Sequence, residues 1–163
     1  ASVALPWLLS GLGLGPSLFA LDDQLKLFRA RTLMLTVKMA RVMRGVPKED
    51  IGAVWNRHLD YVIPLATAYA EQVALERFIG VIERADITLK PTLQRLCSLY
   101  ALTHIERSIG LFIELGLVVS SDIKAIKEEK RNLCSEVAAE AVPLVSGLAV
   151  REFSTAPISK DWV

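Results

Sequence analysis

The side chains best suited to chemistry in this chain are its two histidines, His58 and His104. An imidazole can accept or donate a proton near neutral pH, so either could act as a general base. His104 lies in a long apolar helical pattern, where a histidine with a structural partner is favoured over a catalytic base. We therefore expect His104 to be a satisfied helix residue and His58 to lie at a contact between helices.

Four helical glutamates could also supply a carboxylate base: Glu71, Glu76, Glu106 and Glu114. They are spread along the chain, and nothing in the spacing pairs them for acid–base work. The spacing Glu-x-x-His, which di-iron bundles use twice, does not occur. Glu76-Arg77 and Glu106-Arg107 are expected to form structural ion pairs between helices.

None of the other motifs that would indicate a functional site is complete in this sequence. Cys97 and Cys134 form no Cys-x-x-Cys pair, and we expect buried free thiols in a reducing compartment rather than a disulfide. The run from Gly11 to Gly15 places Pro16 where a dinucleotide fingerprint needs glycine, and no strand pattern precedes it. No Gly-x-Ser-x-Gly elbow occurs. The sequence thus predicts no catalytic, cofactor-binding or metal-binding residue in this chain.

Composition indicates a helical domain with a substantial core. The chain has 163 residues, 52% of them hydrophobic, and a net charge of +1. Charges of both signs are mixed along the chain, which argues against a nucleic-acid partner. Residues 1–21 carry no charge, but Pro6, Pro16 and three glycines interrupt any helix there. We expect an apolar linker against a partner surface, and a membrane span is disfavoured.

Helical periodicity runs through residues 22–147, which we assign to one bundle domain. Residues 148–163 are expected to form an extended tail. The architecture predicted is all-α, a bundle of about four long, mostly antiparallel helices joined by short turns. The expected helices are Asp23–Arg44, Pro47–Arg84, Pro91–Leu115 and Ser121–Ser146, with Gly45, Gly116 and Gly147 as stop residues.

Apolar stripes predict which helix faces are buried. In the first helix the stripe consists of Leu25, Phe28, Thr32, Leu35, Met39 and Val42. In the second it consists of Ile51, Trp55, His58, Val62, Leu65, Tyr69 and Val73, and it continues to Phe78, Val81 and Ile82. Pro64 should kink this second helix near residues 60–63. The third helix is apolar on most sides, which is typical of a central, buried helix.

Several blocks of the sequence resemble the acyl-CoA oxidase family. Leu96-Cys97-Ser98-Leu99-Tyr100-Ala101-Leu102 resembles a Leu-Cys-x-Leu-Tyr-(Ala/Ser)-Leu block of that family, and Leu133-Cys134-Ser135-Glu136-Val137 resembles the next one. In Ala141-Val142-Pro143-Leu144-Val145 the family's following acidic residue is replaced by Ser146. Upstream, residues 28–33 are similar to the family's first arginine-rich helix, and residues 73–78 to its second.

The resemblance implies the C-terminal helical domain of a flavoenzyme similar in fold to acyl-CoA dehydrogenases. Such enzymes convert acyl-CoA and oxygen to trans-2-enoyl-CoA and hydrogen peroxide in fatty acid β-oxidation. FAD would belong to the parent enzyme, whose flavin contacts and catalytic glutamate lie in upstream domains. This chain alone is expected to bind no FAD and to be inactive, with a packing role against the upstream core and a second subunit.

The cellular compartment and the class of protein each have more than one possible answer. The resemblance implies a peroxisomal location in a eukaryote and a cytoplasmic one in a bacterium. The chain ends in Asp161-Trp162-Val163 rather than Ser-Lys-Leu, so no targeting signal is visible. The alternative to an oxidase domain is a free-standing helical module that binds a protein partner or a lipid.

Overall fold

The computed structural model describes residues 18–147, and within that range every regular element is helical. This confirms the predicted all-α class. The elements are α2 (Leu21–Met43), the short 3₁₀ helix η1 (Lys48–Asp50), α3 (Ile51–Arg57), α4 (Leu59–Arg84), α5 (Lys90–Arg107), α6 (Ile109–Glu114), α7 (Asp122–Ala139) and α8 (Ala141–Gly147). No described helix is long and apolar enough to cross a membrane.

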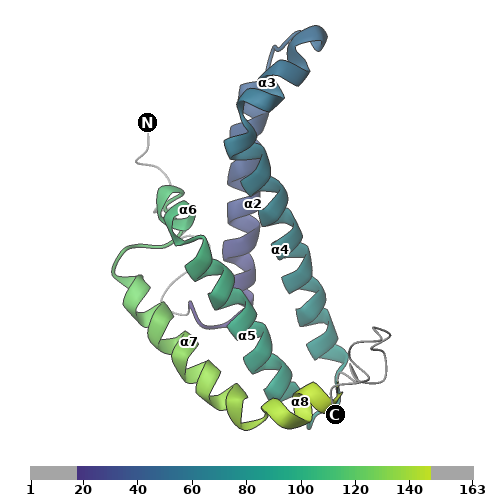
Figure 1. The fold of residues 1–163 in the computed structure, drawn as a ribbon, viewed down its shortest axis with the longest axis vertical. Helices are drawn as coiled ribbons and strands as arrows, with labels where there is room; N and C mark the ends of the chain where they lie inside the picture. Colours follow the sequence, from purple (N-terminus) through teal and green to yellow (C-terminus); the bar gives the residue numbers. More distant parts are fainter. Residues whose placement is uncertain (1–17, 148–163) are drawn as a thin grey trace, which may run out of the picture.

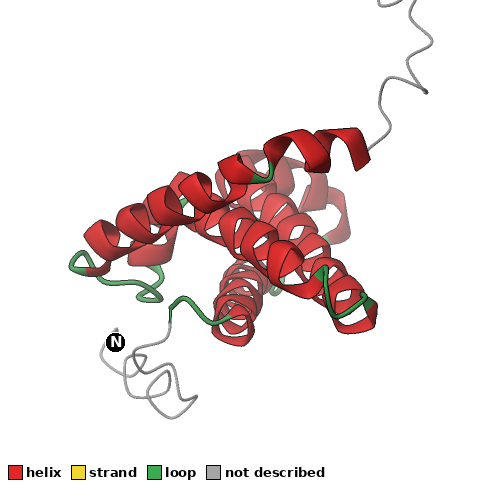
Figure 2. Ribbon diagram, turned by 90° about the horizontal axis from the view of Figure 1, so that it is seen from below, coloured by secondary structure: helices red, strands yellow, loops and turns green. Residues whose placement is uncertain are grey.

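Four helices form the body of the bundle. The antiparallel pair α2–α4 lies beside the pair α5–α7, and α5 packs against α7, α4 and α2 (Figure 1). The α2–α4 hairpin extends beyond the other helices and carries α3 at its far end. Seen along the bundle, the helices are joined by short loops (Figure 2). The predicted linker and tail fall mainly on residues 1–17 and 148–163, which lie outside the described range.

Glycines end two of the helices, as predicted. Gly45 follows α2 with φ +78°, and Gly116 follows α6 with φ +69°. Only glycine adopts this left-handed conformation at little cost. At the second site the Gly116 N–H donates to the carbonyl of Ile113, and the Leu117 N–H donates to that of Phe112, both at 2.9 Å. These bonds satisfy carbonyl groups that the helix end leaves free.

Three of the four predicted helices are interrupted at a single residue, which corrects their predicted continuity. His58 separates α3 from α4, Ser108 separates α5 from α6, and Glu140 separates α7 from α8. Pro64 lies inside α4, and the interruption of the predicted second helix falls before it, at His58. Pro143 belongs to the first turn of α8, where its missing N–H leaves no helical bond unmade.

The core confirms the predicted face of α2 and the central place of α5. Phe28, Thr32, Leu35 and Met39 are buried on α2. Cys97, Ala101, Leu102 and Ile105 of α5 are fully buried. Phe112 of α6 packs its ring 6.1 Å from that of Phe28. These contacts bring residues from both helix pairs into one core.

The predicted buried stripe of the second helix is mostly wrong, because Ile82 is the one member of it that is buried. Ile51, Trp55 and Tyr69 are exposed, Tyr69 at 61%. The residues that α4 buries are Ala68, Glu71, Leu75 and Ile82. Because α4 carries apolar residues nearly all the way round, its periodicity has no clear phase, and packing alone decides which face is inside.

Candidate functional site

The most unusual residue in the described range is Arg31, an arginine with only 1% of its surface exposed. It lies on α2, and its guanidinium carbon is 4.8 Å from the centre of the Phe28 ring and 4.9 Å from that of Phe112. Aromatic faces attract a cation because their π electrons present negative charge. Two rings therefore stabilise part of the charge that burial takes out of water.

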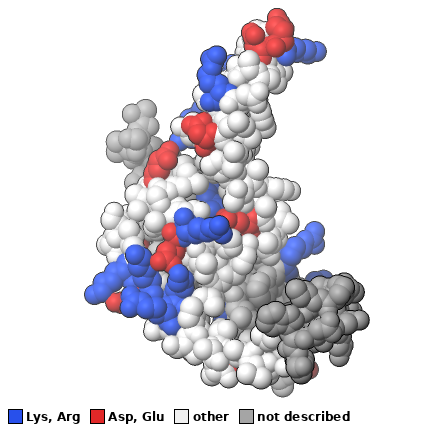
Figure 3. Space-filling model, in the orientation of Figure 1, with Lys and Arg blue, Asp and Glu red and all other residues white. Residues whose placement is uncertain are grey.

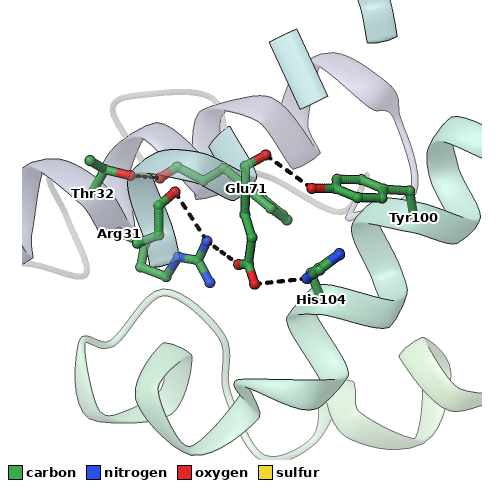
Figure 4. A network of polar contacts seen from close by, with 7 residues as sticks. Arg31, Thr32, Glu71, Tyr100 and His104 are labelled. Carbon is green, nitrogen blue, oxygen red and sulfur yellow. Dashed lines mark hydrogen bonds and ion pairs between the residues drawn. The ribbon is translucent and has the colours of Figure 1, made fainter. Parts of the chain in front are cut away.

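Glu71 of α4 neutralises this arginine. Arg31 Nη2 donates to Glu71 Oε2 at 2.7 Å and lies 3.5 Å from the carbonyl oxygen of Ala68 (Figure 4). A buried charge needs a partner and hydrogen bonds, since isolation in the interior costs several kcal/mol. The sequence gives one signal for this pair. Arg31 stands beside Thr32 on the buried stripe of α2, but its partner is forty residues further on.

His104 of α5 completes a three-residue network. Its Nδ1 lies 2.8 Å from Glu71 Oε1, and its ring contacts that of Tyr100 in a tilted arrangement with the centres 4.3 Å apart. The Tyr100 hydroxyl donates to the backbone carbonyl of Glu71 at 3.4 Å. Burial raises the pKa of Tyr100. Three helices thus meet at Glu71, and the expectation that His104 is a satisfied helix residue agrees with this geometry.

The chemistry open to this network is limited. Both carboxylate oxygens of Glu71 already have partners, one in Arg31 and one in His104. A general base needs a free oxygen within hydrogen-bond reach of a substrate proton. Arg31 Nε is buried without a hydrogen-bond partner, but the guanidinium lies over two aromatic rings. The network is therefore built to join helices.

The other candidate carboxylates also form ion pairs between helices, as predicted for Glu76 and Glu106. Glu76 accepts from Arg29 at 2.7 Å, Glu106 from Lys130, and Glu114 from Lys38 at 2.6 Å. The hydrogen bond from Arg29 lowers the pKa of Glu76, and that from Lys130 lowers the pKa of Glu106. The hydrogen bond to Glu114 raises the pKa of Lys38.

The two cysteines differ, which corrects the prediction that both are buried. Both thiols are free, but Cys97 is buried in α5 while Cys134 is exposed on α7. Burial raises the pKa of Cys97 to about 11, so its thiol is protonated and unreactive near neutral pH. His58 lies at the junction of α3 and α4, with its ring 6.3 Å from that of Tyr61.

A surface hollow of about 480 Å³ lies where the start of α2 meets α4, α5 and α7. Its apolar lining consists of Phe19, Leu21, Ile79, Ile82 and Leu133. Arg95, the cation at its edge, is already paired with Glu140 and lies 3.9 Å from Glu136. Its Nε is buried without a hydrogen-bond partner, and Gln94 and Ser98 are the uncharged polar side chains of the lining.

The glycines of residues 18–147 form no glycine-rich loop of the kind that holds a dinucleotide in many folds. In such a loop the backbone lies at the N-terminal end of a helix, where the dipole attracts a pyrophosphate. The two positive-φ glycines, Gly45 and Gly116, both follow C-terminal ends of helices, which carry the opposite partial charge. Residues 18–147 also contain no group of three or more His, Cys, Asp or Glu side chains placed to hold a metal ion.

Comparison with known proteins gives a consistent result. A family model described as acyl-CoA oxidase matches residues 20–155. The chain is 32% identical over 139 residues to acyl-coenzyme A oxidase 2, peroxisomal, from Arabidopsis thaliana, covering 83% of this chain and 20% of that protein. It is 26% identical over 128 residues to the acyl-coenzyme A oxidase-like protein of Mus musculus, covering 76% of this chain and 20% of that protein. The chain thus spans about a fifth of these relatives. No solved structure matches it.

Proposed function

Because the chain belongs to the acyl-CoA oxidase family, we propose that it is the C-terminal helical domain of a flavin-dependent acyl-CoA oxidase. In that enzyme acyl-CoA and oxygen become trans-2-enoyl-CoA and hydrogen peroxide. The role of this domain is packing, and catalysis is carried by the upstream domains. The peroxisomal names of the plant relatives favour a peroxisomal location in a eukaryote; a bacterial enzyme would be cytoplasmic.

The observation that carries this proposal is the saturation of the buried network. Glu71 is engaged on both oxygens, so it has none to offer to a substrate. The other carboxylates considered as bases are held by cations of neighbouring helices. A domain whose four candidate carboxylates are all engaged by its own helices is suited to support an enzyme by shape and stability.

The chain covers only a small part of each relative's length, which agrees with catalysis in the upstream domains and packing in this one. About four-fifths of each relative lies outside the matched segment, which leaves ample chain for a flavin site and an acyl-CoA site. FAD and acyl-CoA are therefore assigned to the parent enzyme. The partners of this domain are the upstream flavoenzyme core and a second subunit.

A chimera tests the proposal. In the Arabidopsis acyl-coenzyme A oxidase 2, the matched segment is replaced by residues 20–155 of this chain. The chimera should be soluble, hold FAD and form peroxide from acyl-CoA. The same enzyme with the segment deleted should aggregate or lose its flavin. The 163-residue chain by itself should show no flavin absorbance and no oxidase activity.

Two results would contradict the proposal. If the enzyme without the matched segment kept full activity and unchanged thermal stability, the segment would have no packing role. A yellow, active preparation of the 163-residue chain would show that it carries the chemistry itself.

A further inference from the structure

The far end of the α2–α4 hairpin, residues 40–64, contains no buried side chain. It comprises the end of α2, η1, α3 and the start of α4, and it projects beyond the other helices (Figure 1). Met39 and Ala68 are the nearest buried residues on either side. Leu65 is the first residue after this segment that packs against the core, and no residue from 40 to 64 does so. We call residues 40–64 the arm, and the rest of the described bundle the body.

The charged side chains of the arm do not tie it to the body. They are Arg41, Arg44, Lys48, Glu49, Asp50, Arg57 and Asp60, and both signs of charge are visible at the tip of the projection in Figure 3. No ion pair among residues 18–147 involves any of them. In the body, by contrast, Arg31 of α2 is paired with Glu71 of α4. At the base of the arm, Lys38 Nζ lies 4.7 Å from the centre of the Tyr61 ring.

The backbone of the arm has three weak points. His58 separates α3 from α4, Pro64 lacks the N–H that a helix interior needs, and Gly52 of α3 has a low helix propensity. α3 has only seven residues, and helices of that length are unstable in water without packing. The arm is therefore held mainly by half-buried apolar side chains such as Val54 and Val62.

We propose that the arm opens and refolds as one unit while the body of the bundle stays folded. The free energy of a local opening is set by the contacts that it breaks, and opening the arm breaks none of the core. The buried pair of Arg31 and Glu71 lies in the body, so it remains intact in the open form.

The arm is therefore the part of the described chain that can change conformation by itself. Lids and other moving elements of proteins are drawn from such segments of low local stability. Its opening is a property of this chain and does not rest on the proposed oxidase role. A failure of this inference would leave the chimera experiment unaffected.

Hydrogen exchange of the backbone amides, measured by mass spectrometry on the full 163-residue chain, tests the independence of the arm. The amides of α3 should be protected, but at least about 100-fold less than those of α5. Glu71→Gln destabilises the body, so it should lower the protection of α5 and leave that of α3 unchanged. Equal protection of α3 and α5, no protection of α3 at all, or an equal loss in both helices in Glu71→Gln would overturn the proposal.

A substitution within α3 tests whether the arm is one unit. A Cβ at Gly52 meets open space, so Gly52→Ala should stabilise the helix. It should slow exchange by up to about fivefold at the end of α2, in α3 and at the start of α4 alike, and leave α5 unchanged. Slower exchange in α3 alone, or an equal change in α5, would overturn the proposal.

A matched pair of proline variants separates the arm from the body. Asn56→Pro, at an exposed position of α3, should abolish the protection of the arm while α5 keeps the protection of the parent. The control is Asn132→Pro, at an exposed position of α7, which should lower the protection of α5 because α7 packs on it. Loss of protection in α5 in the Asn56→Pro variant would show that arm and body unfold together, and would overturn the proposal.

Discussion

Arg31 and Glu71 form a buried charge pair whose consequence for stability depends on how it is disturbed. Two charges taken out of water contribute little net stability when paired, but removal of one leaves the other without compensation. The Phe28 and Phe112 rings stabilise the guanidinium but cannot replace a carboxylate. We therefore regard the pair as a device that fixes how α2, α4 and α5 fit together.

Glu71→Gln should lower the free energy of unfolding by about 3–5 kcal/mol, because it leaves the Arg31 charge buried and unpaired. Urea denaturation followed by circular dichroism measures the change. Glu76→Gln is the matched control, since its Arg29 pair is largely exposed, and it should cost about 1 kcal/mol or less. Equal losses in the two variants would show that the buried pair has no special role.

Burial of Cys97 predicts a loss of stability at alkaline pH. Its pKa is about 11 in the folded chain, compared with its usual 9.0. Between these values the unfolded chain has released the thiol proton while the folded chain retains it, so the free energy of unfolding falls as pH rises. Cys97→Ala should reduce this slope, and Cys134→Ala should preserve it. A Cys97→Ala variant with the parent's slope would contradict the assignment.

The sequence predicts the burial of a residue when its neighbours in the same helix decide it. It does not predict burial that depends on partners far away in the sequence. The burial of Cys97 follows from its place in an apolar helix. The burial of Arg31 does not, because its charge is tolerated only through Glu71 and two rings that the fold brings from other parts of the chain. Cys134 was predicted to be buried, but α7 turns that position to water.

At the scale of the element, α2 and α4 show what periodicity can and cannot predict. α2 has a distinct apolar stripe, and most of its predicted residues are buried. α4 is apolar on two opposite sides, one in the core and one exposed, so no phase could be chosen from the sequence. Gly45 and Gly116 could be predicted as stops, but the interruptions at His58 and Ser108 carry no glycine or proline of their own.

Gly116→Ala tests the helix stop. A side chain at φ +69° is strained, and the substitution should lower the free energy of unfolding by about 1 kcal/mol. Gly110→Ala is the control, because Gly110 lies inside α6 with open space around its Cα, and it should be neutral or stabilising by up to about 1 kcal/mol. Chemical denaturation measures the free energy of unfolding of both variants. Changes of the same sign and size would contradict the role of Gly116 as a helix stop.

At the scale of the whole molecule, the described bundle exposes many large apolar side chains, among them Leu33 on α2 and Ile63 on α4. Such surfaces are typical of a domain that packs on other protein. Residues 1–21 add an uncharged segment, which we propose packs on the flavoenzyme core.

Deletion of residues 1–16 should raise solubility and reduce the largest assemblies while leaving helicity nearly unchanged. The reason is that this apolar segment has no partner surface when the core is missing. Light scattering on the deleted and full chains measures the assemblies, and circular dichroism measures the helicity. Equal masses would show that the segment is inert, and loss of helicity would show that the bundle needs it.

The most direct measurement compares thermal stability and turnover in the chimeric oxidase with and without Glu71→Gln. If the domain supports the enzyme by packing, the variant's melting temperature falls while the turnover number per bound flavin, measured well below melting, stays the same. Turnover that falls by about tenfold or more at an unchanged melting temperature would contradict this. In that case Glu71 would act on the reaction itself, and the domain would belong to the catalytic machinery.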